Sequence, residues 1–163
     1  MSEVVLRPVT AADRDWVRAL MREHWGDEIV VVNGHVHRPH ELPGFIAEDG
    51  DEKVGLITYN IDGDACEVVS LNALRSGMGI GTMLIDAVRE AAIAAGCRRL
   101  WLITTNDNVD ALRFYQRRGF VLAALRPGEI ARSRLLKPKL PEIGLYGIPI
   151  RDELELEQIL TDA

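Results

Sequence analysis

Residues 70–84 constrain the fold of this chain more than any other segment. An apolar run ends at Leu71, glycines follow at Gly77, Gly79 and Gly81, and an apolar pattern of helical spacing begins at once. Glycine permits positive φ and lets the backbone approach a ligand closely. A helix that starts there presents unpaired N–H groups and the positive end of its dipole. This order of strand, glycine turn and helix predicts a site for an anion, typically a phosphate.

The segment ahead of the turn predicts an antiparallel meander. Strand patterns are separated by Asp49-Gly50 and by Asp62-Gly63, two dipeptides typical of hairpin turns. A helix with an amphipathic pattern precedes the meander, and Asn33-Gly34 marks a further tight turn. The expected elements are strands at 4–6, 29–32, 44–48, 53–59 and 66–71 and a helix at 11–24.

The segment after the turn alternates helices and strands. The helix that starts at the glycines should end at Gly96, and a second helix should end at Gly119. Strands are expected at 99–104, 120–125 and 153–157, the last with one solvated face. The order strand, helix, strand predicts parallel pairing of the strands on either side of the first crossover helix.

Composition limits the class of protein. A chain of 163 residues with 47% hydrophobic residues predicts a single domain, residues 1–163, with a substantial core. The net charge of −6 argues against a general nucleic-acid binder. Cys66 and Cys97 are expected to be reduced thiols. No apolar run approaches the ~20 residues that span a membrane, and the first residues lack a signal-peptide pattern, so we expect a cytoplasmic protein.

Two phosphate-binding motifs can be excluded for the glycine turn. A dinucleotide fingerprint requires a third glycine or an alanine where this chain has Thr82. A Walker loop requires a lysine between Gly81 and Thr82, which are adjacent here. The turn therefore belongs to another class of phosphate site.

The turn resembles the acetyl-CoA motif of the GNAT superfamily of N-acetyltransferases, Gln/Arg-x-x-Gly-x-Gly/Ala. The corresponding window is Ser76-Gly77-Met78-Gly79-Ile80-Gly81, in which both marked glycines match and Ser76 replaces the first residue. The second family motif, Asn-x-x-Ala-x-x-x-Tyr-x-x-x-Gly-Phe, is matched at every marked position between Asn108 and Phe120. The resemblance implies an α/β (α+β) fold with flanking helices and a mixed, mostly antiparallel sheet of about six or seven strands, two of them parallel and splayed.

The resemblance also implies direct transfer of an acetyl group from acetyl-CoA to a primary amine. Backbone N–H groups of the turn would hold the pyrophosphate, and the strand ahead of it would face the pantetheine. A backbone N–H near Leu71 would polarise the thioester carbonyl. The expected cofactor-binding residues are Leu71, Asn72, Ala73, Ser76, Gly77, Met78, Gly79, Ile80, Gly81, Thr82, Asn108, Ala111 and Tyr115.

Two residues are candidates for proton transfer. A phenol at Tyr115 could protonate the leaving thiolate, or the ring could simply pack beneath the cofactor. Glu67 shares a strand face with Val69 and Leu71, where a partly buried carboxylate would suit a base. Glu67 could instead be a solvated edge residue, with a water chain as the base. Asn108 could contact the pantetheine or only cap its helix.

The remaining sequence features do not identify the acceptor amine. Residues 35–40 contain three histidines, which could line the acceptor site or lie on a solvated loop, and no metal site is expected. The connection 127–149 should help to shape the acceptor pocket. One or two of Arg113, Arg117 and Arg118 could meet the CoA 3′-phosphate, or simply favour a helix C-terminus.

The expected partner is a small-molecule or peptide amine, with no nucleic acid or membrane and with a homodimer as an open option. Two alternatives to the enzyme remain: an acyl-CoA-binding module without catalysis, and a partner-binding protein that uses residues 127–149.

Overall fold

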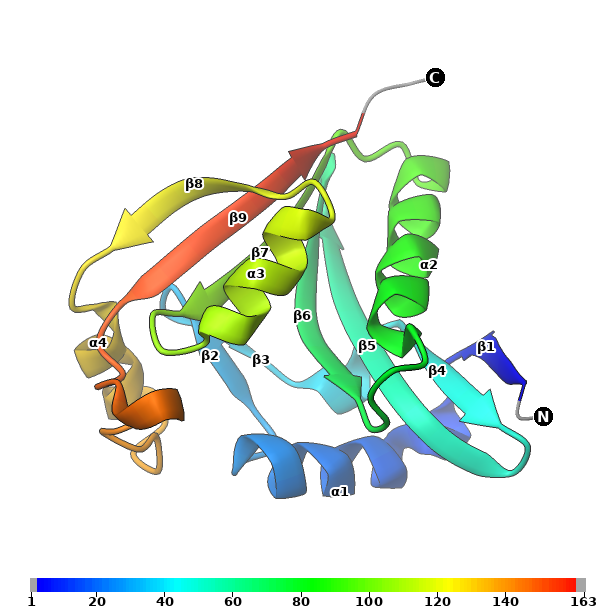
Figure 1. The fold of residues 1–163 in the computed structure, drawn as a ribbon, viewed down its shortest axis with the longest axis horizontal. Coiled ribbons are helices and arrows are strands. Elements are labelled where there is room, and N and C mark those ends of the chain that lie inside the picture. Colours follow the sequence, from blue (N-terminus) through cyan, green and yellow to red (C-terminus); the bar gives the residue numbers. More distant parts are fainter. Residues whose placement is uncertain (1–2, 161–163) are drawn as a thin grey trace.

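The computed structural model of the chain describes residues 3–160, and it has one central sheet with helices on both faces (Figure 1). The sheet has seven strands in the order β1-β4-β5-β6-β7-β9-β8. A separate two-stranded hairpin, β2-β3, lies outside it. This arrangement confirms the mixed, mostly antiparallel sheet with flanking helices.

The expected strands and helices are present in the expected order, and the structure adds a short strand at 35–37 that was not among them. The strands are β1 (Val4–Pro8), β2 (Val30–Val32), β3 (His35–His37), β4 (Gly44–Asp49), β5 (Glu52–Asp62), β6 (Ala65–Ala73), β7 (Arg99–Thr105), β8 (Val121–Arg126) and β9 (Glu153–Ile159). The helices are α1 (Arg14–Trp25), α2 (Ile80–Ala94), α3 (Val109–Arg117) and α4 (Glu129–Leu136). Short 3₁₀ turns are η1 (Ala11–Asp13), η2 (Pro39–Glu41) and η3 (Leu145–Gly147).

The strands divide the core into two layers because successive side chains of a strand point to opposite faces. On β4, Ile46 packs in the cluster that contains residues of α1, whereas Ala47 packs in the cluster that contains residues of α2. Tyr115 of α3 belongs to the same cluster as α2. Helices α2 and α3 therefore cover one face of the sheet, and α1 covers the other.

The only parallel pair among the sheet strands of residues 3–160 is β6 with β7, as the crossover helix α2 predicts. Their pairing runs only from Ala65–Arg99 to Val68–Leu102, although both strands continue further. Beyond this point the strands part, which is visible in Figure 1 between the arrowheads of β6 and β7. The backbone of β6 after Val68 consequently has no ladder partner on its β7 side.

The position of β9 is the part of the topology that the sequence pattern does not specify. β9 enters the sheet between β7 and β8 and pairs antiparallel with both. The expectation of one solvated face on this strand is wrong at Glu153, whose side chain faces the interior and is 1% exposed. Glu155 and Glu157 instead receive hydrogen bonds from Arg99 of the neighbouring strand.

Two further expectations concern the thiols and the membrane. Cys66 and Cys97 are both buried and free, which agrees with the expected reduced state. Within residues 3–160 no helix has the length and apolar character that a membrane crossing requires.

Candidate active site

The glycine turn forms an open helix start of the kind that binds anions, at the beginning of α2. Gly77 and Gly79 have φ values of +77° and +70°, a region that favours glycine. Gly79 is the N-cap residue of α2, and no side chain caps the helix there. A Cβ built at Gly77 or Gly79 would meet no atom within 4 Å. The first turn of α2 contains no acidic side chain, so its N–H groups face open space with the helix dipole behind them.

Arginines of α3 gather beside this helix start. A cavity of about 490 Å³ is lined by Thr82, Asp110, Arg113, Phe114, Arg117 and Arg118. The Arg118 guanidinium lies 3.6 Å from the centre of the Phe114 ring, and its Nε donates a 2.8 Å hydrogen bond to Thr82 Oγ1. A flat cation held in this way adds positive charge to the anion site.

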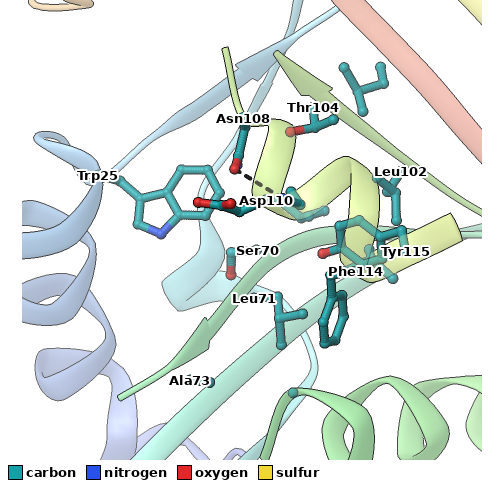
Figure 2. A pocket seen from close by; sticks show the side chains of 15 residues that line it. Trp25, Ser70, Leu71, Ala73, Leu102, Thr104, Asn108, Asp110, Phe114 and Tyr115 are labelled. Atoms are coloured by element: carbon teal, nitrogen blue, oxygen red, sulfur yellow. Dashed lines mark hydrogen bonds between the residues drawn. The ribbon is translucent and has the colours of Figure 1, made fainter. Parts of the chain in front are cut away.

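A groove opens where β6 and β7 part, with a volume of about 330 Å³ (Figure 2). Its walls come mainly from β6, β7 and α3, with Trp25 of α1 and Gly81 of α2 beside them. Among the expected cofactor-binding residues, those that line this groove are Leu71, Ala73, Gly81, Asn108, Ala111 and Tyr115. The structure thus brings together residues of both motifs around one opening.

Tyr115 lies on α3 and its hydroxyl points into the groove in Figure 2. Its ring packs edge-on against Phe114 and Phe120, with ring centres 5.1 and 5.5 Å away. Within the described residues the hydroxyl has no hydrogen-bond partner, and burial raises its pKa well above the usual value. The raised pKa makes the phenol a weaker acid, so it is the absence of a partner among residues 3–160 that leaves its O–H available to a ligand in the groove.

Asn108 has two roles in the structure. Its Oδ1 accepts a hydrogen bond of 3.2 Å from the Ala111 backbone N–H, which makes it the N-cap of α3. It also lines the groove (Figure 2). The cap is therefore present, and the carboxamide nitrogen remains available to a ligand.

The other expected residues of β6 and of the turn lie around the groove rather than in it. Asn72 Oδ1 accepts a 2.9 Å hydrogen bond from Trp25 Nε1, so this side chain is held by the end of α1. Ile80 is 1% exposed and belongs to the core, and Met78 packs against that core. Ser76 lies in the turn itself and lines none of the three cavities.

A second cavity of about 430 Å³ adjoins the groove. The two share residues on both parted strands, including Leu71 and Thr104, as well as Trp25 and Asn108. The far wall of the second cavity is formed by β2 and by residues around α4, which include Ile130, Lys137, Leu140, Ile150 and Glu153. It therefore provides room for a second reactant next to the opening between β6 and β7.

Trp25, Lys137 and Glu153 line this second cavity and were not among the predicted site residues. Trp25 could have been noticed as an aromatic residue at the end of an amphipathic helix. Lys137 lies in the connection 127–149 that was expected to shape the acceptor pocket, but neither it nor Glu153 stood out, because each resembles an ordinary charged surface residue. Both are nevertheless buried, with exposed fractions of 6% and 1%.

Glu67 is buried, but it lies where β6 is still paired with β7, opposite Trp101. Its Oε1 is 3.2 Å from His37 Nε2, and it lines neither the groove nor the second cavity. His35 and His40 also lie outside both cavities. Of the three histidines, only His37 meets a residue that the sequence analysis singled out.

Comparison with known proteins agrees with this geometry. The chain matches the acetyltransferase (GNAT) family over residues 10–120. It is 44% identical over 139 residues to the uncharacterised protein YdhI of Bacillus subtilis, an alignment that covers 85% of this chain and 87% of that one.

Solved structures with the same fold are more distant in sequence. An IAA acetyltransferase from Bacillus cereus superposes with a TM-score of 0.73 at 20% identity, over 97% of this chain and 100% of the other. A Bacillus subtilis acetyltransferase in complex with CoA gives a TM-score of 0.68 at 19% identity, over 99% and 100% of the two chains. At this identity the similarity shows the fold.

Proposed function

This chain belongs to the GNAT family of acetyltransferases, and from this membership we propose that it transfers an acetyl group from acetyl-CoA to a primary amine by direct attack. The observation that carries the proposal is Tyr115, a protonated phenol that lines the groove between the parted strands. An acyl-CoA-binding module without catalysis would have no need of an acid at that place.

The residues of the turn fit the cofactor. The open space at Gly77 and Gly79 and the uncapped start of α2 suit a pyrophosphate, and the arginines near Thr82 suit a further phosphate. The groove that Leu71, Ala73 and Ala111 line suits the pantetheine arm. When bound there, acetyl-CoA supplies the thioester whose carbonyl carbon the amine attacks.

The backbone of β6 supplies the electrophilic assistance. Residues after Val68 have no ladder partner on the β7 side, so an N–H group near Leu71 can donate to the thioester oxygen. A donor of this kind, placed in advance, contributes about 2.7–4 kcal/mol to transition-state stabilisation in other enzymes. The parting of the strands is therefore the feature that leaves this donor unpaired.

Tyr115 acts as the general acid in this account. A phenol is neutral at pH 7, so its hydroxyl oxygen holds a proton that it can pass to the sulfur as the sulfur leaves with negative charge. The aromatic contacts with Phe114 and Phe120 hold the ring in place. This orientation directs the hydroxyl into the groove.

For the amine proton we propose Glu67 as the final acceptor, reached through water. Glu67 lies on β6 outside both cavities, so direct contact with an amine in them is not part of the proposal. Its Oε1 lies 3.2 Å from His37 Nε2. Glu67→Gln should lower kcat at neutral pH by about 10-fold or more, with the deficit shrinking as pH rises and the amine deprotonates in solution.

Initial-rate kinetics with a panel of amines test the proposal. Thiol release from acetyl-CoA and the mass of the acetylated product are measured while both reactants are varied. Direct attack predicts intersecting double-reciprocal lines, whereas parallel lines would indicate an acetyl-enzyme and contradict direct attack. Tight binding of acetyl-CoA without thiol release for any amine would favour the silent module instead.

A further inference from the structure

Lys137 is the C-cap residue of α4 and its ammonium group is buried in the wall of the second cavity. Nζ donates hydrogen bonds to the Trp25 and Ile29 carbonyl oxygens, at 3.3 and 3.2 Å. An ammonium group has three donors, so one remains after these two contacts. The rest of the neighbouring wall is largely apolar and includes Val30, Ile130 and Leu140.

This cation has no counter-ion in the described part of the chain. No carboxylate oxygen of residues 3–160 lies within 4 Å of Nζ. Burial lowers its pKa, and the more distant Asp27 only partly opposes this. An unpaired buried charge is costly to the fold, and an anionic partner would remove that cost.

The carboxylates that share the cavity wall already have partners within the protein. Asp107 accepts hydrogen bonds from Thr105 Oγ1 and from the Leu145 backbone N–H. Glu153 accepts one from the Asn33 backbone N–H, and burial raises the pKa of its carboxyl, which the charges of Arg126 and Arg132 only partly oppose. Lys137 is thus the charged side chain of this wall with an unused hydrogen-bond donor.

We propose that Lys137 binds an anionic group of the acceptor, so that the substrate is an amine that also carries a carboxylate or a similar anion. The inference rests on the proposed function. Leu71 and Lys137 line the same cavity, so a single molecule can present its amine to the gap between β6 and β7 and its anion to the ammonium. A volume of about 430 Å³ suits a small molecule.

The test compares amino acids with two neutralised forms of each, the amide and the decarboxylated amine. The amine of an amino acid is more basic than that of its amide and less basic than that of the decarboxylated amine. If basicity alone set the rate, the rate would rise or fall steadily from the amide through the amino acid to the decarboxylated amine. Binding of the carboxylate would instead make the amino acid, which is intermediate in basicity, the fastest of the three. We expect at least one amino acid to exceed both of its relatives in kcat/KM by about 10- to 100-fold.

Variants separate this role from a structural one. In Lys137→Met the preference for the carboxylate should disappear, with the KM for acetyl-CoA unchanged, and Lys137→Arg should retain part of it. Lys139→Met removes an exposed lysine two residues away and should change nothing. Thermal melting of each variant shows whether the loss of the bonds to Trp25 and Ile29 has unfolded the chain.

The outcomes are distinct for the two proposals. Equal or faster acetylation of the neutral forms by the unmodified protein would overturn the role of Lys137 and leave acetyl transfer intact. The role of Lys137 would also be overturned, with acetyl transfer intact, if no amino acid in the panel reacts while other amines do. Failure of every amine, together with failure to bind acetyl-CoA, would contradict the proposed function itself.

Discussion

At the scale of single residues, two side chains carry the chemistry of the account because burial sets their protonation. Tyr115 and Lys137 are both removed from water, and each is shifted towards its neutral form. For the phenol this makes proton release harder, so its proposed role as an acid depends on the hydroxyl pointing into the groove (Figure 2). For the Lys137 ammonium, burial without a counter-ion among the described residues makes the binding of an anion favourable.

Tyr115→Phe tests the acid directly. The variant keeps the ring contacts with Phe114 and Phe120 and removes only the hydroxyl, so folding and acetyl-CoA affinity should be preserved. We expect kcat to fall by about 10²- to 10⁴-fold. Steady-state kinetics and calorimetric titration measure the two effects separately. An unchanged kcat would assign Tyr115 a packing role only.

Some residues of the candidate site could be predicted from the sequence and others could not. Tyr115 and Asn108 could be identified because they occur in a motif with fixed spacing. Lys137 and Glu153 could not, because their burial depends on the packing of α4 and β9 against strands that are distant in sequence. A local pattern contains no information about such a contact.

At the scale of elements, the two helix starts at α2 and α3 frame the proposed cofactor site. α2 begins at a glycine without a capping side chain, whereas α3 begins at Asn108 with one. This difference in capping follows from the roles proposed for the two helix starts. The uncapped helix leaves its N–H groups to a phosphate, and the capped helix satisfies its own.

Substitutions at Asn108 distinguish its cap from its contact with the ligand. Asn108→Ala should lower the free energy of unfolding by about 0.5–2 kcal/mol, because the Ala111 N–H loses its acceptor. Asn108→Ser restores a capping oxygen but lacks the carboxamide. If Asn108 also binds the pantetheine, the serine variant regains stability and still binds acetyl-CoA weakly. Recovery of both in chemical denaturation and titration would show that the cap is its only role.

Local sequence predicted the elements better than their arrangement. Turn dipeptides and glycine caps placed the strands and helices within a few residues of their observed ends. The insertion of β9 between β7 and β8 was not predictable, because a period-two strand pairs equally well at several sheet edges. The burial of Glu153 follows from that insertion and was missed for the same reason.

At the scale of the whole molecule, the core extends over both faces of the sheet and includes titratable groups that play no part in the chemistry. Cys66 is fully buried beneath α2, and burial raises its pKa to about 12. Cys97 is also buried, and its pKa is raised for the same reason. The neutral thiols are therefore part of the folded state.

This burial predicts a loss of stability at alkaline pH. The unfolded chain releases the Cys66 proton above about pH 8.5, whereas the folded chain retains it, so the free energy of unfolding declines as pH rises. We expect a loss of about 1–2 kcal/mol from this thiol by about pH 10. Denaturant titrations of the natural chain and of Cys66→Ala measure the difference, and parallel pH curves would contradict the prediction.

Thiol labelling gives a second readout of the same core. At about pH 8 a small disulfide reagent should leave both cysteines of the folded protein unmodified and label both after denaturation. Rapid labelling of Cys66 in the folded state would show that the sheet face beneath α2 opens readily.

The proposed mechanism depends on acetyl-CoA binding at the glycine turn where α2 begins. Its most direct test is calorimetric titration of acetyl-CoA into the natural protein, Gly79→Glu and Gly96→Glu. The two glycines have similar φ values, +70° and +83°, so both variants carry the same charge and similar strain at opposite ends of one helix. The account predicts micromolar binding that Gly79→Glu abolishes and Gly96→Glu retains. Equal binding by Gly79→Glu, or no binding by the natural protein, would contradict it.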